Sequence, residues 1–180
     1  MRITHSLSSF GILALAALLA SCAPESTPQA TDTSPSGASS EAAMQEAMQP
    51  EHILVKAADV RWVDAPPVLP AGAKVAVLEG DSSKPGPFTM RIKVPPKYRI
   101  APHEHPADEH VTVISGALAI GMGETFTEGA LNTLPVGSFA MMRAGTRHFA
   151  WSEDGAVIQL HGIGPWGLTY VNPQDDPRNQ

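Results

Sequence analysis

The chain has 180 residues, of which 43% are hydrophobic and 17% are charged, and its formal net charge at pH 7 is −6. This composition is typical of a globular domain and excludes a chain that is disordered throughout. The acidic balance argues against nucleic acid as a partner, because neutralising phosphates requires a basic surface. The length predicts one domain together with additional segments.

The first 22 residues have the pattern of a secretion signal. Arg2 and His5 precede an apolar run over residues 10–20, which is too short to span a membrane. The run ends in Leu19-Ala20-Ser21-Cys22, which resembles the lipobox of bacterial lipoproteins. In that class the signal, here residues 1–21, is removed and the cysteine carries the lipid.

We therefore expect lipid attachment at Cys22, which is the only cysteine in the chain and leaves no internal disulfide. The alternative is an ordinary signal with a chance cysteine. Because residue 23 is alanine and not aspartate, the lipoprotein sorting rules imply an outer-membrane lipoprotein whose domain faces the periplasm. Residues 22–52 are rich in Ser, Thr, Pro and Ala, and this lipidated N-terminal segment is predicted to be a disordered linker.

Strand signals dominate after residue 53. β-branched or alternating segments lie between Pro- and Gly-rich turns, and no long helical period interrupts them. A strand over residues 117–122 is expected to fold back on the preceding strand through a turn at Ser115-Gly116, and the polar tail from residue 173 is expected to fray. Further strands are predicted at residues 59–64, 74–79, 88–94, 98–101, 157–162 and 168–171.

A metal site is predicted in the stretch from His103 to Gly116. On an extended strand alternate side chains share a face, so His103 and His105 point to the same side, and Glu109 keeps that parity if the strand continues. Two imidazoles and a carboxylate converging from one strand are suitable ligands for a divalent transition metal. His110 has the opposite parity and is expected to face outward or to support the ligands.

A second stretch, residues 137–151, reads as a strand, a Gly-containing turn and a new strand opening at His148. The two stretches together resemble the paired motifs of the cupin superfamily. The first family motif has the form Gly-x5-His-x-His-x3–4-Glu-x6-Gly, and it is matched here by His103, His105, Glu109 and Gly116. Lys97 stands in place of the leading glycine.

The second family motif has the form Gly-x5-Pro-x-Gly-x2-His-x3-Asn. Gly137, Gly145 and His148 fit it, whereas Arg143 replaces the proline and Ser152 the asparagine. These departures affect turn positions and not the ligand.

The resemblance implies an all-β fold, a single-domain cupin-type β-barrel (jelly roll) over residues 53–172. It also implies a divalent transition metal, one of Fe, Mn, Ni, Cu or Zn, held by His103, His105, Glu109 and His148. The alternative is a metal-free barrel in which these histidines are satisfied in the core.

Gln159 and His161 share one face of the predicted strand 157–161. If that face looks inward, His161 is a candidate catalytic acid or base and Gln159 a candidate substrate-binding residue. If it looks outward, both are solvated. Both orientations stay open at this point.

Three neutral histidines and one carboxylate leave a divalent ion with a net charge of about +1 and open coordination positions, which suits oxygen activation. With zinc the same ligands suit a Lewis acid. Cupins include oxygenases, isomerases, decarboxylases and binding modules, and fold does not choose among them. We expect a dioxygenase-like oxidoreductase acting on a small organic molecule; the alternative is a non-catalytic sensor or scavenger. The expected partners are that small molecule, the membrane through the lipid anchor, and a second copy of the chain in a homodimer.

Overall fold

The computed structural model describes residues 52–180. The predicted signal peptide, the lipid-attachment site Cys22 and the linker up to residue 51 lie outside the described residues. No helix within residues 52–180 is long and apolar enough to cross a membrane.

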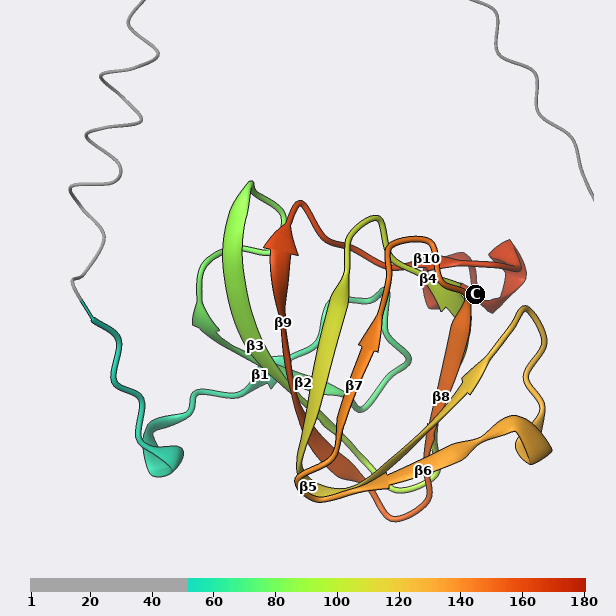
Figure 1. The fold of residues 1–180 in the computed structure, drawn as a ribbon, viewed down its shortest axis with the longest axis horizontal. Coiled ribbons are helices and arrows are strands. Elements are labelled where there is room, and N and C mark those ends of the chain that lie inside the picture. The colour runs from blue at the N-terminus through green and yellow to red at the C-terminus, as the bar shows by residue number, and fades with distance from the viewer. Residues whose placement is uncertain (1–51) are drawn as a thin grey trace, which may run out of the picture. The chain divides into compact units, whose positions relative to one another are not determined.

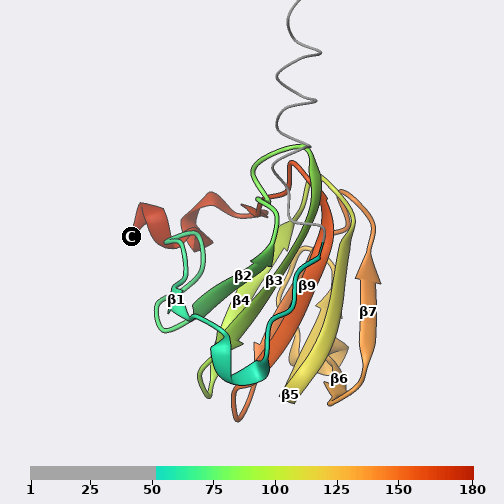
Figure 2. The same ribbon diagram turned by 90° about the vertical axis from the view of Figure 1, so that its left-hand side faces the viewer.

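The described residues form ten strands and four short 3-10 turns, so the predicted all-β class is confirmed. Figures 1 and 2 show the strands curling around a common interior. The strands are β1 Val63–Asp64, β2 Lys74–Glu79, β3 Gly86–Val94, β4 Tyr98–Glu104, β5 Glu109–Met122, β6 Asn132–Pro135, β7 Phe139–Met142, β8 His148–Ser152, β9 Ala156–Gly164 and β10 Thr169–Tyr170. The 3-10 turns are η1 Ala57–Asp59, η2 Glu128–Ala130, η3 Pro173–Asp175 and η4 Pro177–Asn179.

The strands pair antiparallel in two groups that share β5. The first sheet has the order β1-β2-β3-β9-β5, with β7 on the other side of the N-terminal half of β5. The second sheet pairs the C-terminal half of β5 with β6 and β8, and continues through β4 to β10. One long strand therefore joins the two walls of the barrel.

The predicted turn at Ser115-Gly116 is wrong, because β5 runs through this position without folding back. Gly116 has φ 71°, and a Cβ there would lie 2.1 Å from the carbonyl oxygen of Gly155. The register against β9 shifts between Val113 and Ser115, which is the mark of a β-bulge. A glycine with positive φ is compatible with a bend as well as a turn. Gly116 therefore marks a change of direction in the chain, but the change is a bend within one strand and not a hairpin turn.

The bulge also explains the change in the burial pattern along β5. Val111 and Val113 are buried before it, whereas Leu118 and Ile120 are buried after it. One extra residue moves the inward-facing positions from odd to even numbers. Both halves of the strand thus present aliphatic side chains to the same interior.

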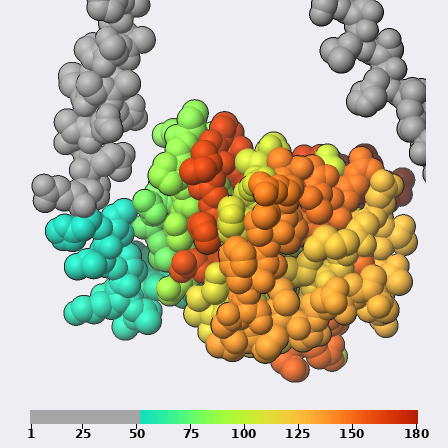
Figure 3. Space-filling model, in the orientation of Figure 1, coloured from blue at the N-terminus to red at the C-terminus, as the bar shows by residue number. Residues whose placement is uncertain are grey.

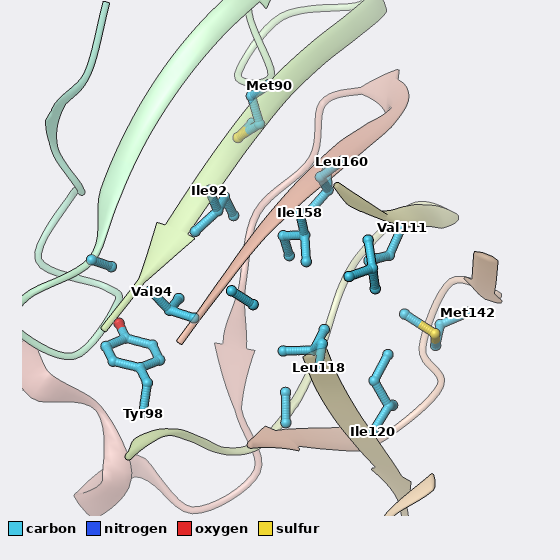
Figure 4. Close-up of a cluster of buried hydrophobic side chains, with 14 of the residues drawn as sticks. Met90, Ile92, Val94, Tyr98, Val111, Leu118, Ile120, Met142, Ile158 and Leu160 are labelled. Atoms are coloured by element: carbon cyan, nitrogen blue, oxygen red, sulfur yellow. The ribbon is translucent and has the colours of Figure 1, made fainter. Parts of the chain in front are cut away.

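The interior is built from the alternating apolar positions of the strands. Figure 4 shows these side chains converging from β3, β5 and β9. The buried cluster includes Met90, Ile92 and Val94 on β3 and Ile158 and Leu160 on β9.

The two ends of the domain differ from the predictions. Strand β1 covers only Val63–Asp64, and the expected strand residue Asp59 ends the 3-10 turn η1. The tail beyond residue 172, which was expected to fray, forms η3 and η4: Asp176 is 8% exposed, and its carboxylate accepts hydrogen bonds from the backbone and side chain of Arg178.

Candidate metal centre

The four predicted ligands come together on the inner wall of the barrel. His103 lies on β4, His105 follows its last residue, Glu109 opens β5 and His148 opens β8. His103 and His148 are directly paired across β4 and β8. All four are buried, with exposed fractions between 3% and 6%. The ligand atoms of the three histidines lie within 4.8 Å of one another, so these residues form a group suited to metal binding.

Backbone carbonyls fix the orientation of all three imidazoles. The Nδ1 of His103 lies 2.8 Å from the carbonyl oxygen of Ala101, that of His105 lies 2.6 Å from Gly167, and that of His148 lies 2.9 Å from Thr146. A carbonyl can only accept, so each Nδ1 carries the hydrogen and donates it. In the neutral ring each Nε2 then keeps its lone pair, which is the tautomer a metal-binding histidine needs.

Glu109 completes the cluster. Its Oε2 lies 3.2 Å from the Nε2 of His148 and 3.5 Å from the Nε2 of His105. With Nδ1 protonated, a neutral imidazole has no hydrogen on Nε2 to donate to this carboxylate. The facing lone pairs therefore need a cation between them, either a proton or a metal ion. Two ligands about 2.1 Å from one ion lie about 3–3.5 Å apart, in keeping with these distances.

The protonation of the cluster favours metal binding over a charged core. Burial, with the neighbouring His148 and His105, lowers the pKa of His103 to about 3. Burial raises the pKa of Glu109, but with a proton as the intervening cation, hydrogen bonding and charge from His105 and His148 outweigh burial and bring the pKa to about 2. At neutral pH His103 is therefore a neutral ligand and Glu109 an anionic one.

The Nε2 of His105 is buried and has no hydrogen-bond partner among the described residues. An orphaned buried nitrogen costs about 1–3 kcal/mol unless something binds it. This nitrogen, the shared tautomer and the carboxylate together fit a divalent transition metal.

The cluster lines a cavity of about 290 Å³ inside the barrel. The remaining walls are almost entirely aliphatic and come from β2, β3, β4, β5, β7, β8 and β9 and from loop residues before β2, before β3 and after β9. Among the described residues, the four members of the cluster are the only acids or bases that line this cavity.

Gln159 and His161 do not belong to this cavity, so the inward orientation considered for them is wrong. Their neighbours on β9, Ile158 and Leu160, line the cavity instead, and alternation puts Gln159 and His161 on the outer face. Gln159 accepts a hydrogen bond from Arg91 at 3.2 Å. No role for Gln159 in binding substrate, or for His161 in catalysis at the cluster, follows from this placement.

His110 also faces outward, as its parity indicated. Its ring stacks on that of His161 with 4.9 Å between centroids, in a surface hollow that both residues line. Figure 3 shows this side of the barrel, where β3, β9 and β7 reach the surface with no helix over them.

Trp166 is the cavity residue that the sequence reasoning missed. It lines the cavity, and its ring stacks on His105 with 4.2 Å between centroids and 19° between planes. Its backbone N–H donates to the carbonyl of Ser82 at 2.6 Å. A Cβ at Gly164 would lie 2.2 Å from the carbonyl oxygen of Lys84, so only glycine allows these two loops to approach. The His161-Gly-Ile-Gly-Pro-Trp segment, two glycines beside an aromatic residue, was the available signal.

Comparison with solved structures shows the same fold in several bacterial proteins. The polyketide cyclase RemF from Streptomyces resistomycificus matches with a TM-score of 0.57 and 16% identity, covering 70% of this chain and 89% of that one. A protein from Methylibium petroleiphilum, provisionally named an acetylacetone dioxygenase, matches with a TM-score of 0.55 and 18% identity over 72% of this chain and 87% of its own. An RmlC-like cupin from Shewanella frigidimarina matches with a TM-score of 0.50 and 16% identity over 64% and 92%.

No curated protein matches the chain. A family profile described as the ChrR cupin-like domain matches residues 50–163, which is more than half of the sequence. The fold and this match agree with the paired motifs, and the chain belongs to the ChrR-like cupin family.

Proposed function

We propose that this protein is a metal-dependent oxidoreductase of the dioxygenase type, acting on a small organic molecule bound beside the histidine cluster. His103, His105, His148 and Glu109 would hold one divalent ion. In this reaction class both oxygen atoms of O₂ enter the organic product, so no separate reductant is needed. A redox-active ion held there would supply the means of activating oxygen.

The observation that carries this proposal is that the cluster of three histidines and Glu109 lies in an otherwise mostly aliphatic cavity. Apart from the cluster itself, its described lining contains no side chain that could act as a general acid or base. Chemistry in such a cavity depends on a bound ion. The chain contributes three histidine ligands, whose Nδ1 atoms are held by backbone carbonyls, and apolar walls that exclude water. The name given to the Methylibium neighbour points the same way, although its similarity concerns the fold.

The alternative function is a non-catalytic module that binds metal, or metal and ligand. The same lack of an acid or base favours it, because a binding site needs none. Oxygen uptake separates the two. Protein loaded in turn with Fe, Mn, Ni, Cu or Zn is tested against a panel of phenols and carbonyl compounds. We expect uptake with a redox-active ion, none with zinc, and loss in His148→Ala but not in the outer-face control His161→Ala. Binding of panel compounds without uptake for any ion contradicts the oxidoreductase and supports the binding module.

We also propose that the domain is tethered in the cell envelope by a lipid on Cys22, as an outer-membrane lipoprotein facing the periplasm. The support is the Leu19-Ala20-Ser21-Cys22 sequence at the end of a short apolar run. Cys22→Ser should move the protein out of the membrane fraction or leave it as an uncleaved precursor. Mass spectrometry of the wild-type N-terminus provides the second measurement. Unchanged fractionation together with an unlipidated Cys22 contradicts the tether.

A further inference from the structure

We infer that the molecule bound in the barrel is uncharged and largely hydrocarbon, has about ten non-hydrogen atoms, and carries an oxygen that accepts a hydrogen bond from the indole N–H of Trp166. This inference rests on the proposed function in one respect: it takes the cavity beside the cluster as the substrate site. An aliphatic ketone is the simplest molecule that meets all of these requirements.

The walls of the cavity exclude a charged or strongly polar substrate. Twenty-four residues line it. Beyond the four members of the cluster, the only polar side-chain groups are the hydroxyl of Ser82 and the indole N–H of Trp166. No Lys, Arg, Asn, Gln or Asp is among the described lining residues. Away from the cluster, an ionised group would lose its hydration with nothing to replace it. Sugars and amino acids, which need several polar partners, fit poorly for the same reason.

The aliphatic lining favours a flexible or branched hydrocarbon body. The side chains that present methyl and methylene groups come from both sheets, so they would surround a ligand on several sides. They include Val75, Met90, Ile92, Val111, Leu118 and Leu160. Each CH₂ group transferred from water to such a site contributes about 0.8 kcal/mol, or about a fourfold gain in affinity.

The volume limits the length of the ligand. A cavity of about 290 Å³ corresponds to about ten water molecules at the density of the liquid, since each occupies about 30 Å³. This is at the small end of the range for ligand sites, about 300–1,000 Å³. Affinity should therefore rise with chain length and stop rising at about ten non-hydrogen atoms.

Trp166 supplies the single directional contact. Its Nε1 is buried and has no hydrogen-bond acceptor among the described residues. The ring stacks on His105, whose Nε2 is also buried without a partner among the described residues. Buried donors are nearly always paired in folded proteins. An oxygen of the ligand placed here would accept from Trp166 beside the metal ligands.

The test uses three probes of equal size and different polarity: 2-nonanone, its alkene isostere 2-methyl-1-nonene, and octanoate. Binding is measured at pH 7 by equilibrium dialysis, with the free probe quantified by gas chromatography, on the mature protein with zinc bound and without metal. In the metal-free protein we expect 2-nonanone to bind about 2–10-fold more tightly than the alkene, the effect of one hydrogen bond. Ionised octanoate should bind at least tenfold more weakly than the ketone.

The variants separate the hydrogen bond from packing. Trp166→Phe keeps an aromatic ring against His105 but removes the N–H, so the ketone should lose its advantage while the alkene still binds. A purely structural role of Trp166 would weaken both probes alike. Ile158→Phe, which fills the cavity, should lower binding of both, whereas the adjacent outward change Gln159→Phe should not.

Two results overturn the inference: octanoate binding as tightly as 2-nonanone to the metal-free protein, or a ketone preference that survives in Trp166→Phe. Because these two results are obtained on metal-free protein, they are distinct from a failure of the proposed function, which requires bound metal. The oxidoreductase fails on oxygen uptake, whatever the three probes show.

Discussion

Acidification should destabilise the metal-free domain through His103. In the folded protein the pKa of this residue is lowered to about 3, mainly by burial, against an ordinary value of 6.5. Between pH 6.5 and 4.5 the unfolded chain binds a proton at residue 103 that the folded chain excludes, so the free energy of unfolding falls as the pH falls. Two pH units correspond to about 3 kcal/mol. Glu109, whose pKa is lowered to about 2 from 4.5, adds its own loss only below this window.

For a domain of about 130 residues, 3 kcal/mol shifts the melting temperature by about 10 °C. The assay is thermal unfolding by circular dichroism in the presence of a chelator, from pH 6.5 to 4.5. The control is His103→Asn, which retains an N–H donor for the carbonyl of Ala101 but cannot titrate. The wild-type melting temperature should fall by about 10 °C more than that of the variant. Equal slopes, or NMR titration showing that His103 protonates near pH 6, would refute the reasoning.

Two further outcomes test other parts of the structure. Zinc at a thousand times its dissociation constant should stabilise the wild-type domain by about 4 kcal/mol, or about 15 °C in melting temperature. His161→Ala should keep this shift, and His148→Ala should lose most of it. Equal shifts in the two variants would contradict the ligand assignment. Gly116→Ala should cost more than about 2 kcal/mol in urea unfolding, because it adds a backbone clash to an unfavourable positive φ. Gly137→Ala, with φ 84° and no atom within 4 Å of the new Cβ, should cost only about 1–2 kcal/mol. An equal cost for both variants would show that the bend in β5 does not depend on the close approach of Gly116 to Gly155.

The candidate cluster was predictable because its signal is local. His103 and His105 are two residues apart on one strand, and His148 opens another strand after a Gly-containing turn. Spacing and alternation decide that His103 and His105 face the same side. The pairing of β4 with β8 brings His148 to them, and the resemblance to the second cupin motif is what indicated this residue.

The predictions from sequence failed, or stayed open, where tertiary contacts decide the conformation or orientation of a residue. At Gly116 a positive φ is compatible with a turn or a bend, and only the pairing of the two halves of β5 with different strands distinguishes them. The orientation of β9 was undecided because Gln159 and Leu160 lie on opposite faces, and the sequence does not say which face meets the cavity. Trp166 was missed as a site residue because its place beside His105 depends on contact between two loops about 80 residues apart.

Metal content tests the central claim most directly. Wild-type protein isolated from its native envelope should contain about one equivalent of a divalent transition metal by elemental analysis. His103→Ala, His105→Ala, Glu109→Ala and His148→Ala should each lose most of it after identical purification, while His110→Ala should retain the wild-type amount. Wild-type protein that binds no metal even after reconstitution, or a loss in His110→Ala as large as that in His148→Ala, would contradict the account.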